Sequence, residues 1–437
     1  MVLNNYFRLC LVILIPVLCV SYAGEARSAT EGSKGSQPLV IPAASKSVVD
    51  HHDPIEIDST LSLSKVIDLT LEKYPDAAWI QAMENEAAAI ARRSESWTSD
   101  ALQAGLRFQE ATSGTLHYID AQVQVPLWNL GQRDAEKNIA NYAEAGAQAQ
   151  AQATKLRVAG LVRGALWDVA LQKIRFDQSQ IEIAFYEQLL EKIRLRVDLG
   201  DLPRADYLLA KTELLQKRSI LTQAEAELMH ARKRYSSITQ TSRFPEKYEE
   251  ALVDLNEIQK NHPVLAALNT QIERKHAEIS AIELIGSGQS NVAVGINSDQ
   301  FTNDSRSNKT ASFNIGVTVP FGGSAHLAPK IAAANVELNK LIAERELAFR
   351  ELERSHHEAK HNLEVNEVEL GIAEELKQVA EEHLKMMLLS YSVGEIDLLD
   401  LLKIQSRTQQ AILNSKERSV MLQRDKALYN QAVGITP

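Results

Sequence analysis

Histidine spacing is the feature of this chain that most resembles a site for chemistry. His357 and His361 are four residues apart and adjoin His356, and two imidazoles at this spacing on one helical face can bind a transition metal. The surrounding residues are rich in Glu, Lys and Asn, which is typical of a solvated helix surface, so a histidine pair without a ligand is favoured. The His-His-Asp run at 51–53 is weaker still, because it lies in a segment without periodicity. The sequence therefore predicts no metal site.

The sequence contains no other constellation typical of catalysis. The serines, acids and histidines lack catalytic spacing, and no glycine-rich phosphate-binding loop is present. Both cysteines, Cys10 and Cys19, fall within an N-terminal apolar run, which excludes disulfides and thiol catalysis in a processed chain. The formal net charge of −10 argues against nucleic acid as a partner. We predict that the protein is not an enzyme and has no cofactor.

Two carboxylates occupy equivalent places in two halves of the chain. Asp206 and Asp400 each lie six residues after a glycine, Gly200 or Gly394, and both pairs are 194 residues apart (400 − 206 = 394 − 200). The run Val-Gln-Val-Pro-Leu at 123–127 recurs as Val-Thr-Val-Pro-Phe with the same offset. Two such long copies indicate a duplicated half-domain. An acid in the first turn of a helix is also favoured by the helix dipole alone, by roughly a few tenths of a kcal/mol, so a purely structural role stays open.

The N-terminus has the pattern of an export signal. Arg8 precedes an apolar run from Leu9 to Val20, and Ser-Tyr-Ala at 21–23 provides a small-x-small cleavage site. We predict a signal peptide at 1–23 and a flexible leader at 24–57, which is rich in Ser, Ala, Gly and Pro.

Hydrophobic periodicity predicts a mainly α-helical chain with a small β part, in two repeats at 58–245 and 246–437. The first repeat comprises short helices at 61–73 and 76–97, a β-hairpin at about 101–126, a long helix at 133–199, a tip at 200–203 and a helix at 204–240. The second comprises a helix at 263–285, a β-hairpin at about 290–320, a long helix at 329–393 that Pro329 opens, a tip at 394–396 and a helix at 397–432. Helices this long without breakers are typical of coiled coils. Their seams mix Ala, Gln and Thr with aliphatic residues, which favours a wide, hollow tube of helices.

The predicted strands are apolar on one face only. Val123 and Val125 alternate with Gln122 and Gln124, and the second hairpin has the same pattern. The predicted lipid-facing residues are Val123, Val125, Ile315 and Val317. Strands of about ten residues have transmembrane length, but four strands cannot close a barrel, so several copies of the chain are required. A small soluble sheet packed on its apolar face is the alternative.

The order and duplication of these motifs resemble the TolC family of outer membrane efflux proteins. The resemblance covers about 61–434 and rests on Tyr74-Pro75, Val125-Pro126-Leu127 with Gly131, Val319-Pro320-Phe321-Gly322-Gly323, and Tyr391-Ser392-Val393-Gly394 with Asp400. It implies a homotrimer with a twelve-stranded barrel in the outer membrane lipid of a Gram-negative bacterium and an α-barrel reaching into the periplasm. It also implies a periplasmic adaptor, or membrane fusion protein, and an inner-membrane pump of the resistance-nodulation-division class.

The resemblance further implies roles for the helical tips. The gate or constriction would contain Asp400, Asp206, Tyr391 and Lys403, with the Tyr391 hydroxyl bonded to Asp206. Lys403 replaces a second acid of some members, and Ile396 replaces an arginine. The adaptor would dock on Leu199, Gly200, Asp201, Leu202, Val393, Gly394, Glu395 and Ile396.

The sequence thus favours a passive outer membrane channel of a tripartite efflux system. A channel for type I protein secretion remains an alternative of the same architecture. A soluble periplasmic coiled-coil scaffold is an alternative of a different class.

Overall fold

The computed structural model describes residues 55–303 and 306–437, so the predicted signal peptide and most of the predicted leader lie outside the described residues. The elements of the first half are β1 (Glu56–Asp58), α1 (Leu63–Lys73), α2 (Asp76–Glu95), β2 (Gln103–Glu110), β3 (Leu116–Pro126), α3 (Gln132–Asp198), α4 (Arg204–Thr239) and β4 (Arg243–Pro245). Those of the second half are α5 (Pro263–Ile285), β5 (Asn291–Asn303), β6 (Arg306–Thr318), α6 (Ser324–Ser392) and α7 (Leu398–Ala432). Within the described residues, no helix combines the length and apolar character needed to cross a membrane.

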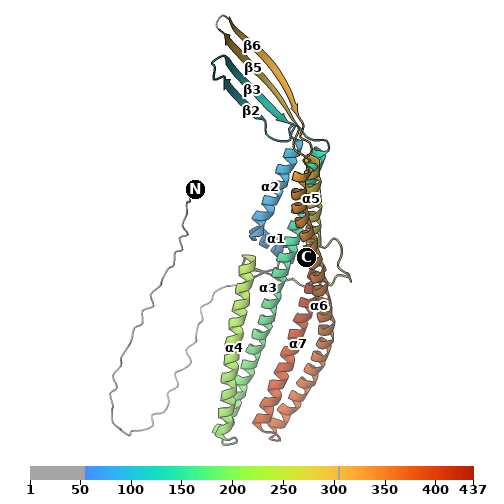
Figure 1. Ribbon diagram of the computed structural model, residues 1–437. Coiled ribbons are helices and arrows are strands. Elements are labelled where there is room, and N and C mark those ends of the chain that lie inside the picture. Colours follow the sequence, from blue (N-terminus) through green and yellow to red (C-terminus); the bar gives the residue numbers. More distant parts are fainter. Residues whose placement is uncertain (1–54, 304–305) are drawn as a thin grey trace, which may run out of the picture. The chain divides into compact units, whose positions relative to one another are not determined.

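Two helical hairpins and one sheet form the framework (Figure 1). The hairpins α3–α4 and α6–α7 turn at one end of the helices, and strands β2, β3, β5 and β6 lie beyond the other end, next to α2 and α5. Helix α3 also packs against α2, α5 and α7, so the two halves of the chain are interleaved. The predicted class, mainly helical with a small β part, is confirmed.

Helix α6 differs from the prediction at its start. Its first residue is Ser324, and Pro329 lies inside the helix instead of opening it. The first amide hydrogens of a helix have no intrahelical acceptor, so proline is tolerated best within the first turn. Pro329 lies just beyond that turn, and its missing amide hydrogen deprives the carbonyl of Ala325 of one helical hydrogen bond.

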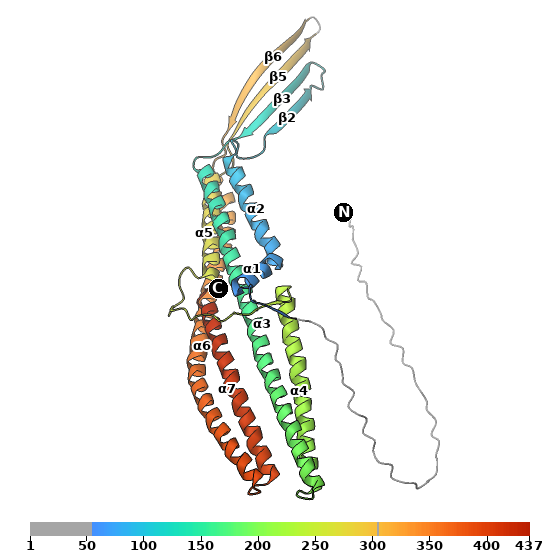
Figure 2. The ribbon, with the colours of Figure 1, turned by 180° about the vertical axis from the view of Figure 1, so that it is seen from behind.

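The four-stranded sheet is antiparallel in the order β2-β3-β5-β6 (Figure 2). Its register aligns the apolar positions of all four strands in rows, such as Ala104, Val123, Val294 and Ile315. Directly opposed residues point to the same face of a sheet. One face is therefore mainly apolar across all four strands, although its far end carries the row Glu110, His117, Gln300 and Lys309. The other face carries Gln, Asn, Asp and Thr.

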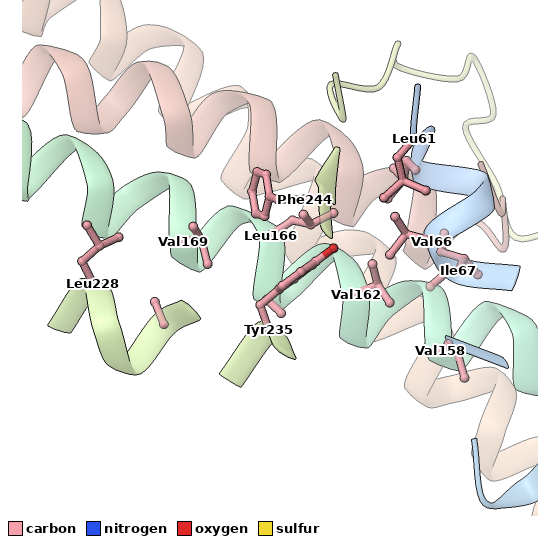
Figure 3. Packing of buried hydrophobic residues seen from close by; sticks show 14 residues of the cluster. Leu61, Val66, Ile67, Val158, Val162, Leu166, Val169, Leu228, Tyr235 and Phe244 are labelled. Atoms are coloured by element: carbon pink, nitrogen blue, oxygen red, sulfur yellow. The ribbon is translucent and has the colours of Figure 1, made fainter. Parts of the chain in front are cut away.

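A buried cluster holds the first helices against α3 and α4 (Figure 3). It includes Val66 and Ile67 of α1, Val162 and Leu166 of α3, and Tyr235 of α4, all essentially inaccessible to solvent. Ile55 packs against the same cluster. The Ser62 hydroxyl caps α1 by accepting a hydrogen bond from the Lys65 amide.

The first strand overlaps the last two residues of the predicted leader, which was expected to end at residue 57. Strand β1 (Glu56–Asp58) pairs in parallel with β4 (Arg243–Pro245), more than 180 residues further along the chain. A three-residue strand whose partner is so distant in sequence leaves no periodic signal.

Candidate functional site

The two helical tips adopt the same turn. Gly200 and Gly394 have φ of 83° and 82°, a left-handed conformation that glycine adopts without steric cost. The amide of Asp201 donates to the carbonyl of Arg196 at 2.8 Å, and that of Glu395 donates to the carbonyl of Ser390 at 2.9 Å. The duplication visible in the sequence is therefore a duplication of backbone geometry.

A second buried cluster joins the two hairpins next to these turns. Its buried members are Tyr186, Leu189, Ile193, Ala210, Leu214, Leu398, Leu401 and Leu402. The first five come from α3 and α4 and the last three from α7. Tyr391, Leu202 and Ile396 pack against it as partly buried residues. Apolar packing thus ties the halves of the chain together at the tips.

Tyr391 does not form the predicted bond to Asp206. Its hydroxyl is buried and has no hydrogen-bond partner among the described residues. The guanidinium of Arg196, on α3, lies 5.7 Å from the ring centroid in a cation–π arrangement. Burial raises the pKa of Tyr391, and the nearby carboxylate of Asp206 raises it further, whereas the positive charge of Arg196 lowers it by less than burial raises it. Arg196 was missed by sequence reasoning, because a contact between halves has no local pattern.

Asp400 and Lys403 form an ion pair at the start of α7. Lys403 Nζ lies 3.1 Å from Asp400 Oδ1, and both side chains are more than half exposed. The amide of Asp400 donates to the side chain of Asp397, which caps the helix. The lysine therefore offsets the negative charge that the sequence analysis assigned to this position. Asp206 holds the equivalent place in α4, in the first turn and partly exposed.

The exposed apolar residues of the tips differ in part from those predicted for docking. Leu199 and Val393 are 77% and 65% exposed. Leu202 and Ile396 instead turn inward against the tip cluster. Gly200, Asp201, Gly394 and Glu395 are exposed as well. One helical turn before each tip, Leu195 and Leu389 are also exposed. Each tip therefore presents two apolar side chains at a spacing of four residues.

The predicted lipid-facing residues share one face of the sheet. Val123, Ile315 and Val317 are exposed, and Val125 is half-buried. On the opposite face, the side chain of Asn314 donates to Asp120 at 3.1 Å.

The histidines form no metal centre by themselves. The rings of His357 and His361 are parallel, with centroids 6.5 Å apart, but the described residues contain no group of three or more His, Cys, Asp or Glu that is arranged to hold a metal. His356 instead lies 3.3 Å from the hydroxyl of Tyr429. The run at 51–53 lies outside the described residues.

The fold, long helical hairpins with matching tip turns joined to a four-stranded sheet, is similar to that of several solved outer membrane channels. The chain is similar to the solved structure of CusC, with a TM-score of 0.69, 12% identity, and coverage of 85% of this chain and 92% of that one. For VceC of Vibrio cholerae the TM-score is 0.69 and the identity 13%, with coverage of 85% of this chain and 96% of that one. MtrE of Neisseria gonorrhoeae is an outer membrane channel solved in its open state. Its TM-score is 0.64 and its identity 15%, with coverage of 85% of this chain and 88% of that one. No protein-family model and no curated protein sequence matches the chain. At these identities the likeness establishes the fold.

Proposed function

We propose that the protein is the passive outer membrane channel of a tripartite efflux system in a Gram-negative bacterium. The observation that carries the proposal is the sheet, whose register places apolar residues of all four strands on one face and polar residues on the other. The outer strands β2 and β6 each have one unpaired edge in the protomer. An open edge in lipid leaves backbone groups without partners. Three copies would pair these edges in a twelve-stranded barrel.

Helix α6 supports the association of several copies. Only Leu338, Asn366 and Ala373 of its 69 residues are buried in the protomer. An exposed apolar series recurs at steps of three, four and seven residues and comprises Val365, Val368, Ile372, Val379, Met386, Leu389 and Val393. This spacing is that of a coiled-coil seam without its partner. A homotrimer would cover the seam with a neighbouring subunit.

The tips are the proposed contact with a periplasmic adaptor protein, which would link the channel to an inner-membrane pump of the resistance-nodulation-division class. The exposed apolar pairs Leu195–Leu199 and Leu389–Val393 support this assignment. The gate would lie at the same end, among Asp206, Tyr391, Asp400 and Lys403. The channel role requires no catalytic group.

Fractionation and electrophysiology test the proposal together. We expect the expressed chain to sediment with the outer membrane, to cross-link as a trimer, and to open discrete conductance steps in planar bilayers. Recovery in the soluble periplasmic fraction would instead support the coiled-coil scaffold. Co-purification with an ATP-driven exporter would favour type I protein secretion, and co-purification with a proton-driven pump would favour efflux.

A further inference from the structure

The two hairpins place four long helices in a row that has an open edge at each end (Figure 1). Helix α3 contacts both α4 and α7, and α7 contacts α6, so the order across the row is α4, α3, α7, α6. Helices α4 and α6 are therefore the edge helices of the row, just as β2 and β6 are the edge strands of the sheet. A tube of helices built from several copies must join these two edges.

Helix α4 carries a series of exposed residues on the side away from α3, which we call the α4 seam. It recurs at alternating steps of four and three residues, the spacing of a coiled coil, and comprises Leu208, Thr212, Leu215, Ser219, Thr222 and Ala226. Leu208 precedes Ala210 by two positions, and Ala210 is buried in the tip cluster with residues of α3. Thr212 precedes the buried Leu214 in the same way. Two residues correspond to about 200° around a helix, so the α4 seam faces away from α3.

The exposed seam of α6 likewise faces away from α7. Asn366 bonds to Asp425 of α7, and Val368 follows Asn366 by two positions. Nearer the tip, Leu384 packs on the tip cluster, and Met386 follows it by two positions. The same rotation of about 200° places Val368 and Met386 on the open edge of the row.

Distance from the tip glycines gives the two seams a common scale. Arg196, four residues before its tip glycine (200 − 196), stacks on Tyr391, three residues before its own (394 − 391). Arg175, 25 residues before its tip glycine (200 − 175), forms an ion pair with Glu417, 23 residues after the other (417 − 394). The two hairpins therefore run level with each other, and equal residue counts from the tips correspond to equal heights to within about one helical turn.

On this scale the apolar positions of the two seams coincide. Leu208 and Met386 are both eight residues from a tip glycine (208 − 200 = 394 − 386), and Leu215 and Val379 are both fifteen residues from one (215 − 200 = 394 − 379). All four side chains are more than half exposed in the protomer. Further from the tips, Ala226 and Val368 are also matched (226 − 200 = 394 − 368).

The polar positions of the two seams coincide as well. The exposed Glu382 lies as far from its tip glycine as Thr212 does (394 − 382 = 212 − 200), and Glu375 as far as Ser219 (394 − 375 = 219 − 200). Thr212 and Ser219 are small enough to leave room for the carboxylates, and Lys211 brings a positive charge close to Glu382. A parallel contact between α6 and α6 of another copy would instead place each glutamate opposite itself, and like charges disfavour association.

We propose that the seam of α6 packs against the α4 seam of a second copy of this chain, with the tips level. The pair is antiparallel, because α6 runs towards the tips and α4 runs away from them. The contact is head-to-tail, and such a contact generates a ring when its rotation closes. This inference rests on the proposed channel function and names the interface that closes its helical tube.

Disulfide trapping in outer membranes of cells that express the full chain tests the interface. Oxidation should link Leu208→Cys with Met386→Cys, and Leu215→Cys with Val379→Cys, into covalent dimers and trimers, because a disulfide requires Cα atoms within about 7 Å. Leu208→Cys with Val379→Cys is the matched control. Its positions differ in height by about 10 Å, so its yield should be at least about tenfold lower. The unsubstituted chain controls for the native Cys10 and Cys19.

Co-expression of two chains shows whether the contact is head-to-tail. We expect covalent dimers when one chain carries only Leu208→Cys and the other only Met386→Cys, and none from either variant alone. Self-linking of Met386→Cys, or equal yields from the level pairs and the offset control, would overturn the proposal. Trimers that form without level disulfides would overturn this interface but leave the proposed channel intact. Absence of trimers in lysine cross-linking would contradict both.

Charge substitutions test the same contact without thiols. Leu215→Glu should lower the trimer fraction at least about tenfold, because it would bury an unpaired carboxylate, and adding Val379→Lys should recover much of that loss. Ile220→Glu is the control, since Ile220 is also exposed on α4 but lies outside the seam. An equal loss of trimer in Ile220→Glu and Leu215→Glu would overturn the proposal.

Discussion

At the scale of single residues, the tips combine groups from both halves of the chain. Arg196 of α3 stacks on Tyr391 of α6, and Lys403 pairs with Asp400 within α7. The first contact spans the two hairpins, and the second adjusts charge within one helix. We therefore expect closure of the proposed gate to depend on the Tyr391 ring, and ion preference to depend on the balance between Asp400 and Lys403.

Substitutions of Tyr391 separate the role of its ring from that of its hydroxyl. Tyr391→Phe removes a hydroxyl that has no hydrogen-bond partner among the described residues, so we expect unchanged single-channel conductance and a stability change within about 1 kcal/mol. Tyr391→Ala removes the ring beneath Arg196 and should raise conductance. A conductance rise in Tyr391→Phe as large as that in Tyr391→Ala would show that the hydroxyl forms a closing bond in the assembled channel.

Ion selectivity should respond in opposite directions to the two partners of the ion pair. Asp400→Asn leaves Lys403 unbalanced and should shift the reversal potential in a salt gradient towards anion preference. Lys403→Gln should shift it towards cation preference. Both variants should fold normally, because an exposed ion pair contributes at most about 1 kcal/mol. Shifts of the same sign, or no shift in either variant, would place this pair outside the conducting path.

At the scale of elements, the strands and the helical hairpins each present one apolar surface that the protomer leaves uncovered. For the strands this surface is continuous, because the register aligns apolar rows across β2, β3, β5 and β6. For the hairpins it includes the seam of α6 and the ends of α3 and α6. We expect the two surfaces to meet different neighbours, lipid for the sheet and protein for the helices.

Arginine substitutions distinguish the two faces of the sheet. Val123→Arg and Val317→Arg should destabilise the assembled protein by about 2–4 kcal/mol if these positions lie near the middle of the bilayer. Gln122→Arg and Thr318→Arg are the matched controls on the polar face and should be tolerated. Urea unfolding in lipid vesicles measures the difference. If arginine were tolerated equally well at Val317 and at Thr318, the lipid-facing assignment would be contradicted.

Charge at the exposed tip residues should block docking without affecting assembly. The double variant Leu199→Glu, Val393→Glu should abolish export and adaptor cross-linking yet leave trimers intact, because both side chains are exposed. Leu252→Glu, at an exposed leucine far from the tips in sequence, is the control. Leu202→Glu should instead impair folding, since Leu202 packs on the tip cluster. Export that survives the double change with cross-linking intact would place the docking site elsewhere.

At the scale of the whole described chain, a buried ion pair connects segments that are distant in sequence. Arg163 of α3 is fully buried and donates two hydrogen bonds, of 2.7 and 2.6 Å, to Glu250. It also donates to the carbonyl of Ile435, near the C-terminus, at 3.1 Å. The arginine thereby anchors the connection between the halves and the end of the chain to the middle of α3.

Substitution of one partner of this ion pair should destabilise the protein more than substitution of both. Arg163→Met leaves Glu250 buried without its counter-charge and should lower the free energy of unfolding by about 3–5 kcal/mol. Adding Glu250→Leu removes the unpaired charge and should recover part of that loss. Chemical unfolding of the solubilised protein measures both variants. A double variant less stable than the single one would mean that the pair itself supplies net stability.

The sequence by itself determined the features that depend on local pattern. Helix periodicity and the turn-forming glycines predicted the long hairpins and their tips, and apolar alternation predicted the faces of the strands. Tertiary structure alone decided which equivalent residues are buried. Leu208 and Leu402 are 194 residues apart (402 − 208), yet they are 52% and 5% exposed. The stacking of Arg196 on Tyr391 and the β1–β4 pairing likewise depend on how distant segments pack. Periodicity in the sequence specifies which face of a helix or strand is apolar. Which other element packs against that face depends on tertiary contacts that the periodic pattern does not encode.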